Sequence, residues 1–228
     1  MNKAISILGI SCSTLNFQGA LQAMLEAHNN KRQTMLLTLN PEICLHALKS
    51  PEYFKAISGA DIVVPDGFGI LFAGRYLSSH RNFFRWLYIL ATPWITTTSG
   101  PFPQRITGID LLTAFLNLAE DRKIFLLGAS EAVNAKLAEE LRNKGVRIVG
   151  NHSGSPRLEE EKDICRMIHQ SEADSLFVAF GAPQQEFWIS RNLQRLPHLR
   201  LAMGVGGSFD MLSKEKSRAP KLLQSFGL

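Results

Sequence analysis

Asp66 is the residue of this chain whose position best suits acid–base chemistry. It lies in the stretch ADIVVPDGFGI, residues 60–70, where a short apolar run typical of a buried strand ends at Pro-Asp-Gly. A carboxylate just past the carboxyl end of a buried parallel strand faces the crevice where open α/β sheets bind ligands. Gly67 and Gly69 leave room for a ligand beside the backbone. Pro-Asp-Gly is also ordinary turn chemistry, so this stretch alone leaves a turn and a catalytic acid as alternatives.

Other polar and glycine-rich motifs follow the remaining apolar runs. They are TLNPE (38–42), RITGIDL (105–111), FLLGAS (125–130), FGAPQQEFWI (180–189) and GVGGSFD with RAP (204–210 and 218–220). We expect Thr38 and Asn40 at a strand end beside Asp66, although both could simply cap the helix that begins near Pro41.

Two of these motifs lead from a strand directly into a helix, at residues 128–130 and 181–183. A helix N-terminus after such a small turn is a common site for phosphate. The second helix begins with Gln184, Gln185 and Glu186. These three could instead form an exposed first turn whose acid suits the helix dipole.

The elements that would position these motifs alternate between strand and helix. Strands are expected at residues 4–10, 33–39, 60–65, 123–127, 146–150, 175–180 and 199–205. Helices are expected at residues 17–30, from 41, 69–77, 108–120, 131–144, 158–170 and from 184. This alternation predicts an α/β fold with a mainly parallel, Rossmann-like sheet covered by helices, and residues 1–228 are long enough for one domain.

Composition indicates an ordinary soluble protein of a reducing cytoplasm. The chain is 45% hydrophobic and 20% charged. Its three cysteines, at positions 12, 44 and 165, form no Cys-x-x-Cys pair and predict neither a disulfide framework nor a zinc site. The first residues, MNKAISILGIS, make a poor signal peptide and a good first strand, so we expect no export.

The net charge of +5 is unevenly distributed. No acidic residue lies between Asp66 and Asp110. Four arginines lie there: Arg75, Arg81, Arg85 and Arg105. The basic residues of the segment 211–228 are Lys214, Lys216, Arg218 and Lys221. Such basic stretches suit an anionic partner, which could be nucleic acid, a phosphate-bearing substrate or an anionic bilayer surface.

Several familiar motifs are missing from the sequence. It contains no G-x-x-x-x-G-K-[ST] and no G-x-G-x-x-G after the first strand, which argues against P-loop enzymes and dinucleotide-dependent oxidoreductases. It contains no Asp-x-Asp, and its six histidines have no paired metal spacing. We therefore expect neither a metal nor a cofactor. No nucleic-acid recognition motif is visible either, so we expect no nucleic acid as partner.

The six strand-end motifs, taken together in this order and spacing, resemble the bacterial WecG/TagA/CpsF family of glycosyltransferases over nearly the whole chain. The resemblance implies a Rossmann-type enzyme that transfers N-acetylmannosamine or its uronic acid from a UDP-sugar. The implied acceptor is polyprenyl-diphosphate-linked N-acetylglucosamine on the inner face of the cytoplasmic membrane. It implies inversion at the anomeric carbon, for which a carboxylate is the usual base.

The resemblance also assigns roles to residues. Asp66 matches the proposed general base and Thr38 a neighbouring polar residue implicated in catalysis. Asn40, Arg105, Gln185 and Asp210 match other pocket positions of the family. From the strand-end motifs themselves, further substrate contacts are expected at Gly67, Gly108, Gly128, Gly181, Pro183, Gln184, Glu186 and Gly206. The distribution of basic residues, rather than the resemblance, is the reason to expect membrane or diphosphate contacts at Arg81, Arg85, Arg218 and Lys221.

The chain departs from the family pattern at two residues and in two segments. Members usually have Lys at Gln184 and Gly at Ser213. The basic and aromatic segment 78–103 is longer than usual, and it could be an interfacial foot, a helix packed on the core or an oligomer contact. Members normally continue past Gly227-Leu228, so we expect a shortened basic C-terminal segment at 211–228. A non-catalytic member that binds nucleotide sugar or a protein partner is the alternative.

Overall fold

The computed structural model describes residues 4–29, 32–78, 87, 100–119 and 121–213. Its core is a six-stranded sheet in which every neighbouring pair is parallel. In spatial order the strands are β4 (Ile62–Pro65), β3 (Thr34–Leu39), β8 (Leu201–Gly204), β7 (Ser175–Ala179), β5 (Ile124–Gly128) and β6 (Ile148–His152). The predicted Rossmann-like parallel sheet is therefore confirmed.

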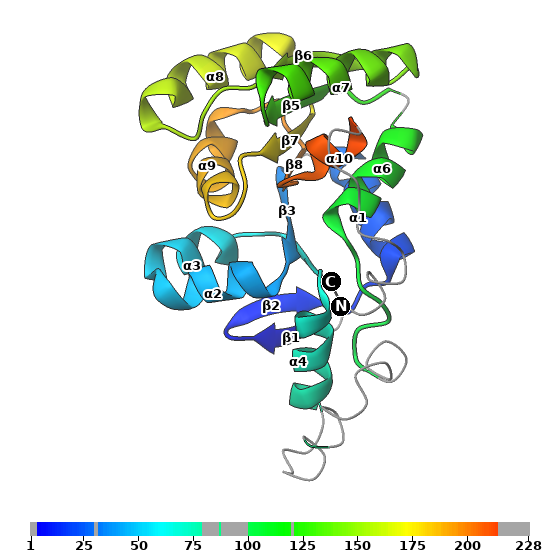
Figure 1. Cartoon of the computed structure of the whole chain (residues 1–228), viewed down its shortest axis with the longest axis vertical. Helices are drawn as coiled ribbons and strands as arrows, with labels where there is room; N and C mark the ends of the chain where they lie inside the picture. Colours follow the sequence, from blue (N-terminus) through cyan, green and yellow to red (C-terminus); the bar gives the residue numbers. More distant parts are fainter. Residues whose placement is uncertain (1–3, 30–31, 79–86, 88–99, 120, 214–228) are drawn as a thin grey trace.

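Helices cover both faces of this sheet (Figure 1). One face packs against α1 (Phe17–Asn29), α6 (Gly108–Leu118), α7 (Glu131–Asn143) and α10 (Ser208–Leu212). The other packs against α2 (Pro41–Lys49), α3 (Pro51–Ser58), α8 (Leu158–Ser171) and α9 (Gln184–Asn192). α9 continues into a 3₁₀ turn at Leu193–Arg195, and α4 (Phe68–Ser78) packs mainly against β1 (Ala4–Ile7).

The alternation of side chains along each strand explains the two layers. In β3, Leu36 joins the core under α1 and α6, whereas Leu37 and Leu39 join the core with α2 and α3. In β4, Val64 and Val63 divide in the same way. Because both faces are buried, these strands read as continuous apolar runs in the sequence.

The amino-terminal run is a correction to the sequence prediction. Residues 4–10 do not form a strand of the main sheet; β1 (Ala4–Ile7) and β2 (Ile10–Ser13) form a separate antiparallel pair. Leu8 and Gly9 turn the chain with φ of 51° and 85°. A two-residue turn with positive φ at both positions matches the twist of a hairpin, and Gly9 is the residue that makes it easy. The sequence reading also did not predict α3 and α10.

The strands end together at one edge of the sheet, and the loops that follow them form the site. The sequence predicts the carboxyl ends of β3, β4, β7 and β8 to within about two residues. No helix within the described ranges is long and apolar enough to cross a bilayer.

Candidate active site

A cavity of about 620 Å³ opens at the carboxyl ends of β3, β4, β7 and β8. This is the place where parallel α/β sheets bind ligands. Eight residues expected to bind substrate or catalyse line it: Thr38, Asn40, Asp66, Arg105, Gly108, Gly181, Gln185 and Gly206. These eight residues come from five separate segments of the chain.

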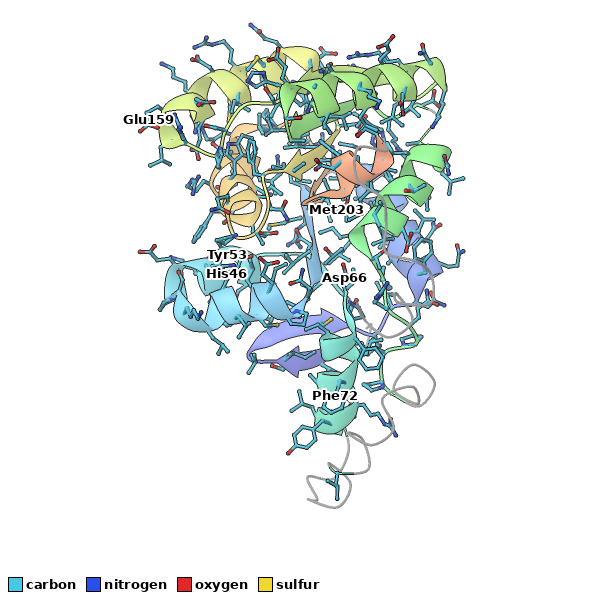
Figure 2. All side chains as sticks on the ribbon, viewed as in Figure 1. His46, Tyr53, Asp66, Phe72, Glu159 and Met203 are labelled. Carbon is cyan, nitrogen blue, oxygen red and sulfur yellow. The ribbon has the colours of Figure 1, made fainter. Side chains whose placement is uncertain are left out.

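Asp66 is fixed by the backbone on both of its sides. Its N–H donates to the carbonyl of Leu39 at 2.7 Å, and the N–H of Ile106 donates to the carbonyl of Pro65 at 2.8 Å. Its Oδ2 accepts a long hydrogen bond of 3.4 Å from the N–H of Gly108, the first residue of α6. Figure 2 shows Asp66 where β4 gives way to α4, with its carboxylate held at the N-terminus of α6.

Burial raises the pKa of Asp66 from its ordinary value of 3.8 to about 6. The hydrogen bond from Gly108, the positive charge of Arg105 and the N–H of Gly67 oppose this rise, and the charge of Asp110 adds to it. A carboxyl group with a pKa near 6 is a stronger base than an exposed aspartate and is still mostly ionised at neutral pH. This is the chemistry that a general base requires.

Thr38 and Asn40 lie beside Asp66, as predicted. Thr38 pairs with Val64 in the parallel register of β3 and β4, so the two strands end side by side. A Cβ on Gly108 would lie 3.5 Å from the Thr38 hydroxyl, which places that hydroxyl against the start of α6. The alternative that both residues cap α2 holds for Asn40 alone, whose Oδ1 accepts from the N–H of Ile43 at 2.9 Å. Asn40 caps the helix and also lines the cavity.

Residues outside the predicted set also line the cavity, among them Glu42, Thr107, Ser208 and Met211. Thr107 is the N-cap of α6 and accepts from the N–H of Asp110 at 3.2 Å. Its place inside RITGIDL, between Arg105 and Gly108, was the available signal in the sequence. Glu42 stands in the TLNPE motif, in the first turn of α2.

Gln185 and Glu186 have structural partners rather than an exposed setting. Gln185 Oε1 accepts from the N–H of Gly206 at 2.9 Å and from the N–H of Gly181 at 3.2 Å. Glu186 is 1% exposed and accepts hydrogen bonds from Gln185 and Tyr53. The alternative of an exposed first turn is therefore wrong for these two residues, and it fits only the exposed Gln184.

Six predicted positions do not line the cavity: Gly67, Gly128, Pro183, Gln184, Glu186 and Asp210. Gly67 lies next to Asp66 with φ of 89°, and a Cβ there would be 3.3 Å from Pro41. Gly128 ends β5, where a Cβ would be 2.7 Å from the backbone of Ala179. These two glycines thus serve close packing of the backbone.

The expected phosphate site at residues 128–130 lies outside the cavity. Ser130 caps α7 by accepting from Val133 N–H at 3.3 Å. Arg81, Arg85, Arg218 and Lys221 lie outside the described residues. No group of three or more His, Cys, Asp or Glu that could hold a metal ion occurs in the part of the chain that the structure describes.

Comparison with known proteins gives a consistent result. The sequence pattern of the family described as "Glycosyl transferase WecG/TagA/CpsF family" matches residues 5–85 and 89–228. A protein of Bacillus spizizenii named N-acetylglucosaminyldiphosphoundecaprenol N-acetyl-beta-D-mannosaminyltransferase is 30% identical over 204 residues, which is 88% of this chain and 70% of the relative. Proteins with the same name from Bacillus subtilis and Staphylococcus aureus are 30% and 29% identical, over 86% and 89% of this chain and 70% and 72% of their own lengths.

Proposed function

The chain belongs to the WecG/TagA/CpsF family of glycosyltransferases, and from this premise we propose that it transfers N-acetylmannosamine, or its uronic acid, from a UDP-sugar to polyprenyl-diphosphate-linked N-acetylglucosamine. One observation carries the proposal for this chain. A buried carboxyl group, Asp66, lies in the cavity at the carboxyl edge of the sheet with a pKa raised to about 6. The names of the relatives support the sugar and the acceptor.

In this proposal Asp66 is the general base. Its carboxylate takes the proton from the attacking acceptor hydroxyl while that oxygen bonds to the anomeric carbon of the donor. The bond between the anomeric carbon and the UDP oxygen breaks on the opposite face, through an oxocarbenium-like state, and the configuration inverts. At pH 7 roughly nine-tenths of a carboxyl group with a pKa of about 6 is ionised, so Asp66 is ready to accept the proton.

The departing diphosphate needs positive charge or N–H donors. Arg105 lines the cavity and favours the ionised form of Asp66 by its charge, so it is the described cation best placed for this task. The N–H groups of Gly181 and Gly206 are less suitable than the sequence suggests, because both already donate to Gln185. Thr38 and Asn40 are proposed to orient the reacting hydroxyl groups.

The test is transfer by the full chain with UDP-N-acetylmannosamine, its uronic acid and UDP-N-acetylglucosamine, each with a lipid-linked N-acetylglucosamine acceptor. We expect turnover with one of the first two donors. Calorimetric binding of UDP without turnover on any acceptor would instead support a non-catalytic member of the family. UDP dependence is tested by the same panel with other nucleotide sugars.

We further propose that the reaction needs no metal ion, since the sequence contains no Asp-x-Asp. EDTA is expected to leave the initial rate unchanged. Loss of activity on chelation, with recovery on adding Mg²⁺ or Mn²⁺, would contradict this proposal.

Peripheral attachment to the inner face of the cytoplasmic membrane is also a proposal. The basic sequence at 75–105 and 211–228 supports it, since each cation near an anionic surface contributes roughly 1 kcal/mol. The chain is expected to sediment with anionic liposomes at low salt, and Arg81→Glu with Arg85→Glu should release it. Sedimentation equal to wild type would favour an oligomer contact for residues 78–103.

A further inference from the structure

Three buried polar side chains connect α3 with two loops of the cavity. The loops are residues 181–183, which follow β7, and residues 205–207, which follow β8; we refer to them as the two glycine loops. Tyr53 on α3 is 0% exposed, and Gln185 and Glu186 at the start of α9 are 5% and 1% exposed. Figure 2 shows Tyr53 in the layer of α2 and α3 that faces α9.

Gln185 ties the two glycine loops to each other. Its single Oε1 accepts from Gly206 at 2.9 Å and from Gly181 at 3.2 Å. Because β7 and β8 are neighbours in the sheet, this one oxygen bonds both loops that follow them and holds them together. Gly204 provides the space, since a Cβ at that position would lie 2.7 Å from Gln185 Nε2.

Glu186 fixes the orientation of the Gln185 amide. Gln185 Nε2 donates to Glu186 Oε1 at 2.7 Å, and the Tyr53 hydroxyl donates to Glu186 Oε2 at 3.0 Å. An amide has one accepting and one donating end. With Nε2 held by the carboxylate, Oε1 must point to the two loops; the reversed amide would place its NH₂ against two N–H donors.

Burying these three polar side chains costs more desolvation free energy than burying apolar side chains of the same size would. Burial raises the pKa of Glu186, and no cationic side chain of the described residues forms a salt bridge with it. Apolar side chains of similar size pack a core without the desolvation that a buried carboxylate suffers. Of its three members, Gln185 is the one that lines the cavity.

We propose that Tyr53 and Glu186 are positioning residues for the transfer reaction, acting through Gln185 to hold the two glycine loops at the spacing that the substrates require. The inference rests on the proposed function. Neither Tyr53 nor Glu186 lines the cavity, so their effect does not depend on contact with a substrate.

The experiment is a double-mutant cycle on transfer by the full chain, using Tyr53→Phe, Gln185→Ala and the double variant. Tyr53→Phe removes one hydroxyl and is expected to lower kcat/KM about tenfold. Gln185→Ala is expected to lower it roughly 10- to 100-fold. The double variant should be no worse than Gln185→Ala alone, because residues that act through one group are not additive.

Asn192→Ala is the matched control. Asn192 is also fully buried on α9, and its side chain donates to the carbonyl of Trp188 at 3.0 Å, away from Gln185. It should lower the melting temperature at least as much as Tyr53→Phe while kcat/KM stays within about twofold of wild type. A merely structural role for Tyr53 would give the two variants the same behaviour.

Three outcomes overturn the positioning role: wild-type kcat/KM in Tyr53→Phe, additive losses in the double variant, or an equal loss in Asn192→Ala. If Tyr53→Phe does not fold, Glu186→Gln keeps the size and removes one acceptor, and the same cycle applies to it. An active wild type with unaffected variants refutes the positioning role alone. A wild type that transfers no sugar to any acceptor overturns the proposed function, and the positioning role with it.

Discussion

The two sides of the cavity use polar side chains in opposite ways. On the Asp66 side, formed by the ends of β3 and β4 and the start of α6, the Thr38 hydroxyl and the Asp66 carboxylate line the cavity, and the backbone holds them. On the Gln185 side, formed by the ends of β7 and β8, the backbone glycines line the cavity and buried side chains hold the backbone.

We infer from this difference that the Asp66 side governs the chemical step and the Gln185 side governs the shape of the cavity. The Asp66 side presents a titratable group whose pKa is raised to about 6, so a change there should alter the reaction itself. The Gln185 side presents N–H groups that already have an acceptor, so a change there should alter how well the cavity fits its substrates. The predictions below test this division, in order of expected effect.

Asp66→Asn should have the largest effect, because it removes the base without changing the size of the side chain. We expect transfer to fall by about 10² to 10⁴ with folding and UDP binding retained. Initial rates and UDP titrations measure both quantities. A variant that keeps more than half of the wild-type kcat would exclude Asp66 from the mechanism.

Asp66→Asn should also change how the melting temperature depends on pH. The pKa of Asp66 is higher in the folded chain, about 6, than its ordinary value of 3.8. Its stabilising contribution is therefore present below pH 3.8 and is lost as the pH rises through about 6. Asp66→Asn should thus melt no lower than wild type at pH 8, with less benefit at pH 5. A lower melting temperature at pH 8 would show that the carboxylate stabilises the fold.

Gly204→Ala should have an intermediate effect, on the Gln185 side. The backbone of Gly204 accepts a side chain, but the new Cβ would occupy the place of the Gln185 amide. The amide must then move and its bonds to the two glycine loops are lost, so the melting temperature should fall as well. We expect kcat/KM to fall about tenfold with the acid limb of the pH profile unchanged.

The Gln185→Ala background makes this prediction specific. Without the amide there is nothing for the Cβ at position 204 to displace, so Gly204→Ala should have little further effect there. Steady-state kinetics of the two single variants and the double variant decide the matter. Multiplying losses would mean that position 204 touches the substrate directly.

The Asp66 side was predictable from sequence because the apolar runs themselves show where its strands end. A buried strand must end where its apolar run ends, and parallel strands end at one edge, so the motifs at 38–42 and 60–70 had to meet there. The hairpin at residues 4–13 was not found, because a short apolar run with one glycine reads equally well as a single strand.

The Gln185 side was less predictable because its contacts join residues that are distant in sequence. Gln185 bonds Gly206, 21 positions away, and Glu186 bonds Tyr53, 133 positions away. Trp188 and Ile189 mark the buried face of α9, and Gln185 lies on that face. Its polar side chain gave no sign of burial, and side-chain partners across a fold follow only from the tertiary structure.

The smallest expected effect is a shift of the acid limb of the pH profile. In wild type, kcat/KM should fall as the pH drops below about 6, because protonated Asp66 cannot accept a proton.

The positive charge of Arg105 lowers the pKa of Asp66, and the charge of Asp110 raises it. Arg105→Met should therefore move the limb to higher pH, Asp110→Asn should move it to lower pH, and Arg105→Lys, which keeps the charge, should leave it nearly in place. Shifts of less than about one pH unit are expected for such partly solvated charges. Profiles of kcat/KM from pH 5 to 8 measure the free enzyme, and Tyr53→Phe supplies the comparison from the other side of the cavity. If Tyr53→Phe moves the limb as far as Arg105→Met does, the two sides are not separate in the way that the structure indicates.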